Sequence, residues 1–247
     1  MKPHWLWEAD YYLRLLKELV FVRRCAVCRQ TIDTGLVCAA CRKHYLLRRV
    51  WRCQPREEYL AGQAAPLPED VLSSVMLLYK YDGAIKEALQ QIKFAADASL
   101  LPLLREEAEA ALPAAKLRWL SQYDLAACVP TSPERRERRG FDVPQELFAP
   151  LLAVGGSCLY CGDLLRRVRR TAPLFELQPL ERRQELAGCF SLNGGVDVRG
   201  KHILLCDDIY TTGSTLAEAA RVLLAAGARE VHALALAAAA DNWESEE

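Results

Sequence analysis

The sequence has no excess of charge of either sign. Its 247 residues include 32 lysines and arginines and 32 aspartates and glutamates, so the formal net charge is zero. A chain with this balance has no overall field that would attract nucleic acid or an anionic membrane, and any such binding must be local. Hydrophobic residues make up 51% of the chain, which allows a full globular core together with one small accessory module.

The N-terminal segment has no unbroken apolar run. Between residues 5 and 21 apolar residues recur at intervals of three and four, which predicts an amphipathic helix. Charged residues interrupt this pattern: Glu8, Asp10, Arg14, Lys17 and Glu18. A signal peptide or membrane-spanning helix would need a continuous apolar stretch. We therefore expect a cytoplasmic protein that does not insert into a membrane.

The 10 cysteines are not expected to form a disulfide framework in a reducing compartment, and only one cluster has the spacing of a metal site. Cys25 and Cys28 form one closely spaced pair, and Cys38 and Cys41 form another. Two such pairs can supply four thiolates to a tetrahedral zinc ion, leaving no open position, so the predicted role of the zinc is structural. The alternative is a small hydrophobic patch of reduced cysteines.

The remaining cysteines show no such arrangement. Cys158 and Cys161 form a third pair on a strand-like stretch, without the helix start that lowers the thiol pKa in redox motifs. The others read as isolated small apolar residues: Cys53, Cys128, Cys189 and Cys206.

Strands and helices are predicted to alternate after a basic, proline-bearing stretch at residues 42–68. The pattern predicts strands at 73–81, 125–130, 201–208 and 230–238 and helices within 83–94, 99–112, 133–153 and 215–227. Such alternation indicates an α/β fold with a parallel sheet that helices cover on both faces. We place a boundary at residue 68, between an N-terminal module (1–68) and a main domain (69–247).

The segment from residue 203 to 227 carries the most specific signal. A buried strand would deliver Asp207 and Asp208 to the carboxyl edge of the sheet, where open α/β sheets bind ligands. Two adjacent carboxylates can accept hydrogen bonds from the hydroxyls of a ribose diol and can help to hold a divalent cation.

A polar turn follows the two aspartates and opens directly into a helix. It consists of Thr211, Thr212, Gly213, Ser214 and Thr215. Hydroxyls and backbone N–H groups at a helix N-terminus suit a phosphate monoester, and glycine lets the backbone approach it. The diol clamp and the phosphate cradle together predict a ribose 5-phosphate site. The simpler alternative is a strand that ends in two solvated aspartates before a helix capped by Ser214 or Thr215.

The stretch from Asp207 to Thr215 resembles the phosphoribosyl diphosphate signature of type I phosphoribosyltransferases. The wider pattern resembles the ComF (GntX-like) family of these proteins, which is associated with natural competence and DNA uptake. The similarity covers the cysteine pairs CAVC and CAAC, then YKYDGAIKEALQQIKF, VPTSPERRERRGFDVPQELFAPL and LLRRVRRTAPLFELQPLERRQELAGCFSL. It implies a type I phosphoribosyltransferase fold that binds 5-phosphoribosyl diphosphate with Mg²⁺ and transfers ribose 5-phosphate to an acceptor that the sequence does not specify.

The resemblance also implies roles for residues outside the loop. Pro130 and Thr131 would lie where the diphosphate binds, and Arg139 would hold it with paired N–H donors. The arginines of this ERRERR run can instead form a solvated face of Glu and Arg pairs. Residues 167–183 would close over the anomeric carbon, with Arg170, Thr171 and Arg183 clamping the leaving group. The implied catalytic residues are Asp207, Asp208, Arg139 and Arg183.

Three positions depart from what the family resemblance implies. Leu174 stands where glutamine is usual and Glu185 where asparagine is usual, which bears on whether the closing loop supports catalysis. Thr211 stands where purine-salvage relatives carry an aspartate, and a threonine cannot take a proton from a purine at neutral pH. Purine salvage is therefore not the expected reaction.

The sequence leaves one other function open and argues against a second. A non-catalytic member of the fold could bind a nucleotide or single-stranded DNA and support competence proteins, using the arginines of 135–139 and 166–170 and Trp5, Trp7 and Trp51. A P-loop nucleotidase would need the segment GVDVRGKH, from Gly195, as its phosphate loop. His202 replaces the required serine or threonine there, and the segment leads into a strand rather than a helix.

Overall fold

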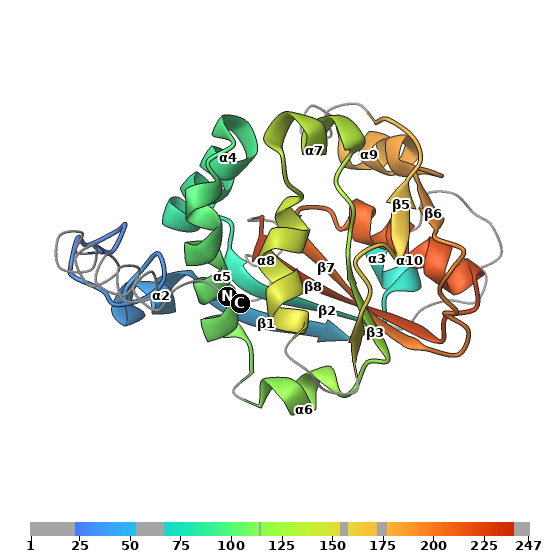
Figure 1. Ribbon diagram of the computed structural model, residues 1–247, viewed down its shortest axis with the longest axis horizontal. Coiled ribbons are helices and arrows are strands. Elements are labelled where there is room, and N and C mark those ends of the chain that lie inside the picture. The colour runs from blue at the N-terminus through green and yellow to red at the C-terminus, as the bar shows by residue number, and fades with distance from the viewer. Residues whose placement is uncertain (1–22, 53–66, 114, 154–157, 172–176, 240–247) are drawn as a thin grey trace, which may run out of the picture.

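The computed structural model describes residues 23–52, 67–113, 115–153, 158–171 and 177–239. Its centre is a six-stranded sheet with the order β1-β2-β8-β7-β3-β4 (Figure 1). The strands are β1 (Leu46–Arg52), β2 (Ser74–Lys80), β3 (Leu125–Cys128), β4 (Leu159–Tyr160), β7 (His202–Tyr210) and β8 (Glu230–Ala238). β1 runs antiparallel to β2 at one edge, and every other pair in this sheet is parallel. The structure confirms the predicted α/β class.

The central strands are buried on both faces. In β7 the run from Ile203 to Cys206 is fully buried, and β8 is buried from Ala233 to Ala238. Near-continuous apolar runs of this kind are typical of parallel strands between two layers of helices, because neither face meets water. Two hydrophobic clusters lie on the opposite faces of the sheet.

Helices contribute to both clusters. One face is covered by α4 (Gly83–Ala95), the short 3₁₀ helix η2 (Ala98–Leu100), α5 (Leu101–Ala111) and α8 (Val143–Leu152). The other is covered by α3 (Pro68–Val71), α9 (Pro179–Leu186) and α10 (Ser214–Ala225). Three further helices are α2 (Ala39–Tyr45), α6 (Lys116–Leu120) and α7 (Pro133–Arg139).

Helix α4 begins and ends where its sequence dictates. The Asp82 carboxylate accepts a hydrogen bond from the Gly83 amide at 2.8 Å, and the left-handed residue Ala96 ends the helix. The apolar stripe that includes Ile85, Leu89 and Ile92 is buried against the sheet. This packing holds the last turn of α4 above the carboxyl edge of the sheet.

The stretch 133–153, predicted to contain a helix, contains two. Gly140 ends α7 in the left-handed region with φ of 83°, and α8 begins three residues later. Glycine populates this region without steric cost, so it allows the sharp change of direction between the helices.

The sequence around the predicted closing segment 167–183 contains two short strands and a helix. β5 (Leu165–Arg167) pairs antiparallel with β6 (Phe190–Leu192), and α9 lies between them in sequence. Strands of three residues are too short to show a periodic pattern, which is why the sequence indicated only a loop.

Strand β1 lies within the predicted N-terminal module 1–68, yet it pairs with β2 of the main domain. The division at residue 68 stays a prediction. Several other predictions lie outside the described residues: the helix within 5–21 with Trp5 and Trp7, Cys53, and Leu174. The same holds for the side chain of Trp51.

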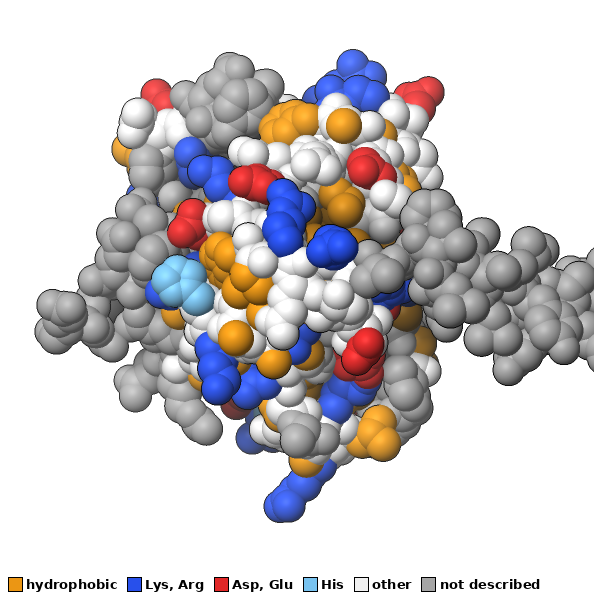
Figure 2. All heavy atoms as spheres, turned by 90° about the vertical axis from the view of Figure 1, so that its left-hand side faces the viewer, with side chains coloured by type: hydrophobic (Ala, Val, Ile, Leu, Met, Phe, Trp, Pro, Cys, Tyr) orange, Lys and Arg blue, Asp and Glu red, His pale blue; other side chains and the backbone are white. Residues whose placement is uncertain are grey.

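The surface agrees with the balanced composition. Figure 2 shows one face of the molecule, on which the basic, acidic and hydrophobic side chains of the described residues are interspersed rather than gathered by type. Among the described helices, none is both long enough and apolar enough to cross a membrane.

Candidate functional site

The two predicted aspartates lie in the C-terminal half of β7, toward the carboxyl edge of the sheet. The structure ends this strand at Tyr210, two residues beyond the predicted end, and Asp207 and Asp208 lie within it, as predicted. Asp208 is 7% exposed, and its Oδ1 lies 2.8 Å from Nζ of Lys93 in the last turn of α4. The Oδ1 atom of Asp207 accepts a hydrogen bond from the Asp208 amide at 2.8 Å. An ion pair thus neutralises one of the two carboxylates.

Asp207 stands in an environment that disfavours its charge. Burial, and then the neighbouring charge of Asp208, raise the pKa of Asp207 from 3.8 to about 8, although Lys93 opposes the shift. An Asp207 carboxyl with this pKa holds a proton at neutral pH. A hydrogen-bond donor or a cation placed beside it would restore the charged form, so the pair is suited to a ligand that brings one of these.

The polar turn after β7 has the conformation expected of a phosphate cradle. Gly213 has φ of 69° and precedes the first residue of α10. A Cβ added at Gly213 would lie 2.5 Å from Cγ of Pro68 and 2.5 Å from Oη of Tyr210, so only glycine fits. The hydroxyls of Thr212 and Ser214 lie 2.8 Å apart. The backbone N–H groups of the first turn of α10 are therefore oriented toward the carboxyl edge of the sheet.

The residue that precedes α8, Asp142, adds a third carboxylate and contacts the turn after β3. The amide of Thr131, which follows Pro130, donates to Oδ2 of Asp142 at 2.8 Å. Asp142 is 5% exposed, and its Oδ1 has no hydrogen-bond partner among the described residues. Burial raises the pKa of Asp142, the Thr131 amide offsets part of this effect, and the charge of Asp208 adds to it. The electrostatic coupling places Asp142 in the same site as Asp208.

Arg139 joins this site from α7. Its Nε donates to the backbone carbonyl of Lys93 at 2.8 Å, which ties the end of α7 to the end of α4. Burial lowers the pKa of Arg139, and the nearby charge of Asp208 opposes that shift. The structure thus brings Arg139 together with the aspartates, as the family resemblance implies.

The predicted closing segment 167–183 approaches α7. Arg170 forms an ion pair with Glu134 in the first turn of α7, and Arg167 donates to the hydroxyl of Thr171. Glu185 pairs with Arg169 at 3.5 Å, which links the segment after β5 to α9. Residues 172–176 lie outside the described residues.

Arg183 is a site residue that the structure does not join to the others. It lies half-buried in the last turn of α9, and none of the side-chain hydrogen bonds or ion pairs found among the described residues connects it to the loop 207–215. Its catalytic role stays a prediction.

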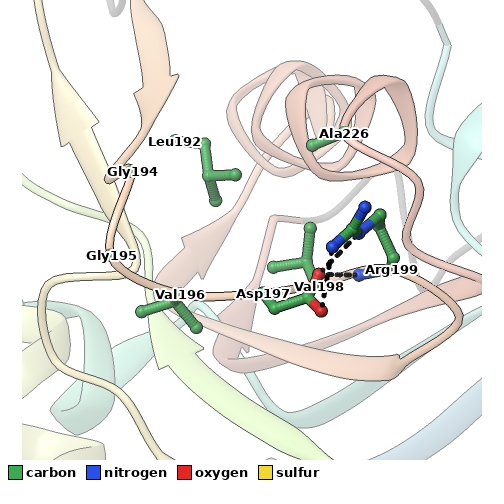
Figure 3. Close-up of a pocket in the computed structure, with 8 residues that line it drawn as sticks. All are labelled: Leu192, Gly194, Gly195, Val196, Asp197, Val198, Arg199 and Ala226. Carbon is green, nitrogen blue, oxygen red and sulfur yellow. Dashed lines mark hydrogen bonds and ion pairs between the residues drawn. The ribbon is translucent and has the colours of Figure 1, made fainter.

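A separate hollow of about 360 Å³ lies on another part of the surface (Figure 3). It is lined by Leu192, Gly194, Gly195, Val196, Asp197, Val198, Arg199 and Ala226. Nε of Arg199 lies 3.0 Å from Oδ1 of Asp197 within it. This is the segment with the partial P-loop motif, and it leads into β7 and not into a helix. The structure confirms that it lacks the context of a P-loop.

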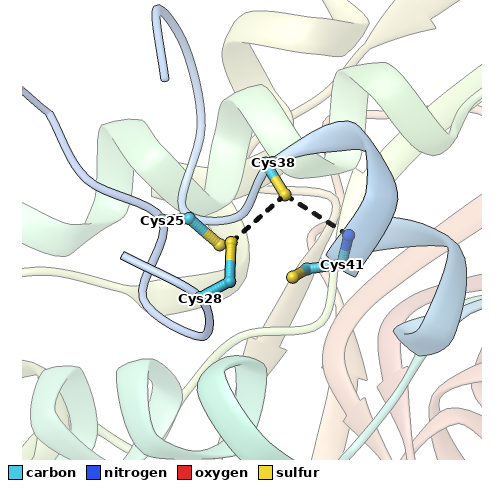
Figure 4. A group of neighbouring side chains, drawn as sticks. All are labelled: Cys25, Cys28, Cys38 and Cys41. Carbon is cyan, nitrogen blue, oxygen red and sulfur yellow. Dashed lines mark hydrogen bonds between the residues drawn. The ribbon is translucent and has the colours of Figure 1, made fainter. Parts of the chain in front are cut away.

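The four N-terminal cysteines converge as their spacing predicts (Figure 4). Their sulfur atoms all lie within 4.8 Å of one another, and Sγ of Cys28 lies 3.7 Å from Sγ of Cys38. Zinc–sulfur bonds of about 2.3 Å in a tetrahedron place sulfur atoms about 3.8 Å apart. Burial disfavours the charged form of Cys25, but amide hydrogen bonds from Cys28, Cys38 and Val27 outweigh it and lower the pKa to about 6. The cluster can therefore hold a structural zinc ion.

This chain is similar to one family of domains and to several competence and DNA utilization proteins. The phosphoribosyl transferase domain matches residues 157–247. The competence protein ComFC of Streptococcus pneumoniae is 30% identical over 168 residues, covering 68% of this chain and 70% of that protein. The chain belongs to the ComF family. ComFC of Bacillus subtilis is 29% identical over 231 residues, covering 90% of this chain and 84% of that protein. The DNA utilization protein YhgH of Salmonella typhimurium is 34% identical over 155 residues, covering 61% of this chain and 66% of that protein.

In this member of the ComF family, one buried carboxylate docks the cysteine cluster onto the main sheet. Glu107 of α5 is fully buried and accepts hydrogen bonds from the amides of Leu36 and Val37 at 2.8 and 3.1 Å. Arg42 donates to it through Nε at 2.6 Å and Nη2 at 3.0 Å, and the hydroxyl of Tyr79 in β2 donates at 3.1 Å. Glu107 therefore holds the segment between the two cysteine pairs in a fixed position.

The other cysteines of this ComF chain are structural where the structure describes them. Cys128, Cys189 and Cys206 are buried within the core, as predicted. Burial raises the pKa of Cys158 to about 11 and also raises the pKa of Cys161. Raised pKa values disfavour the thiolate, which agrees with the absence of a redox motif at this pair.

Three residues of the site were not singled out from the sequence: Lys93, Asp142 and Glu107. Lys93 and Asp142 lie inside the motifs that carry the ComF resemblance, LQQIKF and GFDVPQ, which is the one signal that could have marked them. From the sequence alone, Glu107 resembles any exposed charged residue of an amphipathic helix. Only the three-dimensional packing shows that it is buried.

Proposed function

We propose that the protein binds 5-phosphoribosyl diphosphate with Mg²⁺ at Asp207–Thr215 and transfers its ribose 5-phosphate unit to an acceptor. One continuous stretch of the chain carries the proposal. It contains two carboxylates near the end of β7, then a glycine at a position with no room for a side chain, and then the N-terminus of α10. A diol clamp followed along the chain by a phosphate cradle matches the two ends of a ribose 5-phosphate.

Each part of the ligand has a proposed partner. Asp207 and Asp208 accept hydrogen bonds from the ribose hydroxyls. The 5-phosphate binds the turn made up of Thr211, Thr212, Gly213, Ser214 and Thr215. The diphosphate lies against Pro130 and Thr131, where Arg139 donates to it. Arg183 approaches from α9 when the segment 167–183 closes.

The residues present fit a magnesium ion. Three carboxylates gather within electrostatic range of one another, those of Asp207, Asp208 and Asp142. Asp142 has an oxygen without a hydrogen-bond partner among the described residues, and a cation beside Asp207 would favour the charged form of that carboxyl. Mg²⁺ prefers oxygen ligands, so an ion held by these carboxylates would add positive charge beside them.

The proposed reaction breaks the bond between the anomeric carbon and the diphosphate, whose oxygen leaves with the electron pair. A nucleophilic atom of the acceptor supplies the electron pair for the new bond and loses its proton. The role of this chain is to hold both ends of the ribose, to neutralise the departing diphosphate through Arg139, and to exclude water when the segment closes. Thr211 is no base, so the proton must leave to solvent or to the diphosphate.

Two further assignments belong to this proposal. Zn²⁺ held by Cys25, Cys28, Cys38 and Cys41 stabilises an N-terminal module (1–68) that is docked on the main domain (69–247). The names of the relatives, DNA utilization protein and competence protein, support a role in DNA uptake, carried out in the cytoplasm with competence proteins as partners.

A second candidate is a non-catalytic accessory protein that binds a nucleotide or single-stranded DNA. The ion pair between Arg170 and Glu134 supports it, because this contact brings the arginine stretch 166–170 beside the stretch 135–139. Two adjacent basic stretches could follow a nucleic-acid backbone.

Calorimetric titration separates the two candidates. The intact chain is titrated with 5-phosphoribosyl diphosphate, with and without Mg²⁺, and separately with a single-stranded oligonucleotide. We expect saturable, Mg²⁺-dependent binding of the diphosphate that the double variant Asp207→Asn, Asp208→Asn loses. The control is Asp197→Asn, which removes an exposed carboxylate from the segment that precedes β7. Binding of the oligonucleotide alone by a folded chain would overturn the first proposal in favour of the second.

A further inference from the structure

The opposite edge of the sheet carries a second group of residues with metal-binding side chains. β7 begins with His202 and β8 begins with Glu230, and these two residues are paired in register. His232 follows two residues later in β8, so its side chain lies on the same face as that of Glu230. The ligand atoms of all three residues lie within 4.8 Å of one another.

The separations fit a single metal ion. Nδ1 of His202 lies 3.5 Å from Oε2 of Glu230, and Nε2 of His232 lies 3.2 Å from the same oxygen. Bonds of about 2.0–2.1 Å to a tetrahedral zinc ion place ligand atoms about 3.3 Å apart. The two imidazole rings are nearly parallel, with 16° between their planes and 6.4 Å between their centroids.

Neighbouring groups hold these ligands in place. Oγ of Ser74 at the start of β2 lies 2.8 Å from Nδ1 of His232, and the Tyr123 ring packs 5.1 Å from the His232 ring. When the Ser74 oxygen accepts from Nδ1–H, the lone pair of Nε2 faces Glu230, which is the tautomer that a metal requires. The carboxylate of Asp124 accepts from the His202 amide at 2.8 Å and fixes the start of β7.

The group is also accessible and separate from the phosphate turn. The side chains of His202, Glu230 and His232 are 32%, 42% and 16% exposed, so an ion can enter from solvent. His202 and Asp207 are five residues apart in one strand, which corresponds to roughly 17 Å at the usual rise per residue. A ligand at one edge of the sheet does not touch a ligand at the other.

We propose that His202, Glu230 and His232 bind a divalent transition-metal ion, Zn²⁺ in particular. Two imidazoles and one carboxylate match the ligand preference of zinc and disfavour Mg²⁺, which prefers oxygen atoms alone. Three protein ligands leave the fourth position to water or to a side chain of a binding partner. This site is independent of the proposed transferase activity and of the cysteine cluster.

The proposal is tested by titrating the full chain with Zn²⁺ after dialysis has removed weakly bound metal, while recording the imidazole resonances by NMR. We expect saturable binding of one ion that shifts the signals of His202 and His232. The variants His202→Ala and His232→Ala should weaken this binding at least tenfold. His44→Ala, which removes an exposed histidine from α2, is the matched control and should leave it unchanged.

Two additions keep the test decisive. Glu230→Gln keeps the shape of the side chain and removes its charge, so it serves if a histidine variant fails to fold, and it should also weaken binding at least tenfold. Cys28→Ser with Cys38→Ser removes the other zinc site and should leave the histidine signals responsive to Zn²⁺. The proposal is wrong if the folded chain shows no saturable shift. It is also wrong if the wild-type chain and the variants of His202, Glu230 and His232 bind Zn²⁺ equally, because these three residues would then only be hydrogen-bonded to one another.

Discussion

Lys93 and Asp208 form an ion pair of 2.8 Å between the last turn of α4 and the end of β7. Two carboxylates side by side would repel a phosphorylated ligand, and this ammonium group removes part of that repulsion. The backbone carbonyl of Lys93 also accepts from Arg139. One residue thus links the aspartate pair to the arginine that we expect to hold the diphosphate.

Lys93→Met should weaken the binding of 5-phosphoribosyl diphosphate about tenfold, or about 1.4 kcal/mol, because the site becomes more negative. Lys86→Met removes an exposed lysine from the same helix and should leave affinity unchanged. Calorimetric titration of both variants measures the difference. An equal loss in the two variants would mean that only the total charge of the protein matters.

The raised pKa of Asp207 makes stability depend on pH. In the unfolded chain this carboxyl loses its proton near its ordinary value of 3.8, whereas in the folded chain it keeps the proton up to about pH 8. The folded state therefore binds more protons between these values, and stability falls as pH rises across the window. Without Mg²⁺, urea unfolding at pH 5 and pH 8 should show a loss of about 1–3 kcal/mol that is smaller in Asp207→Asn. Equal losses in the two proteins would contradict this assignment.

Gly213→Ala should lower the free energy of unfolding by about 1–3 kcal/mol, since the new Cβ would meet Pro68 and Tyr210 in a left-handed conformation. It should also abolish phosphate binding, because the turn can no longer keep its shape. Gly194→Ala is the control, as a Cβ there meets no atom within 4 Å. Urea unfolding followed by titration with ribose 5-phosphate measures both effects. If the Gly213 variant is as stable as the Gly194 variant, position 213 has room for a side chain and this prediction is wrong.

Glu107→Ala should destabilise the protein by about 3–5 kcal/mol, because Arg42 and two backbone amides lose their buried partner. Glu109→Ala on the same helix removes an exposed carboxylate and should change stability by no more than about 0.5 kcal/mol. Chemical unfolding of both variants provides the comparison. If the cysteine cluster docks by other contacts, the two values will be similar.

The sequence predicted the parts of the fold that have a long periodic signal. The strands at 73–81 and 201–208 and the helices within 83–94 and 215–227 correspond to β2, β7, α4 and α10. Their apolar runs and caps are local features, which a single sequence displays. The clustering of the four cysteines followed from spacing alone, because two tight turns bring the pairs together.

The contacts between distant elements could not be predicted in this way. β1 lies in a basic stretch that suggests a linker, and it is a strand because β2 offers it an edge to pair with. Lys93 and Asp208 are far apart in sequence, and only the packing of α4 on the sheet brings them together. The cluster of His202, Glu230 and His232 could not be predicted for the same reason, since its members come from two strands joined by a helix.

The central claim is that Asp207 and Asp208 hold a ribose diol while the turn at Gly213 holds its phosphate. The most direct test is calorimetric titration of the intact chain with ribose 5-phosphate and with 2-deoxyribose 5-phosphate, which lacks one hydroxyl of the diol. We predict that the deoxy compound binds at least tenfold more weakly to the wild-type chain, and that the Asp207→Asn, Asp208→Asn variant no longer distinguishes the two. Equal affinity of the wild-type chain for both sugars would contradict the diol clamp.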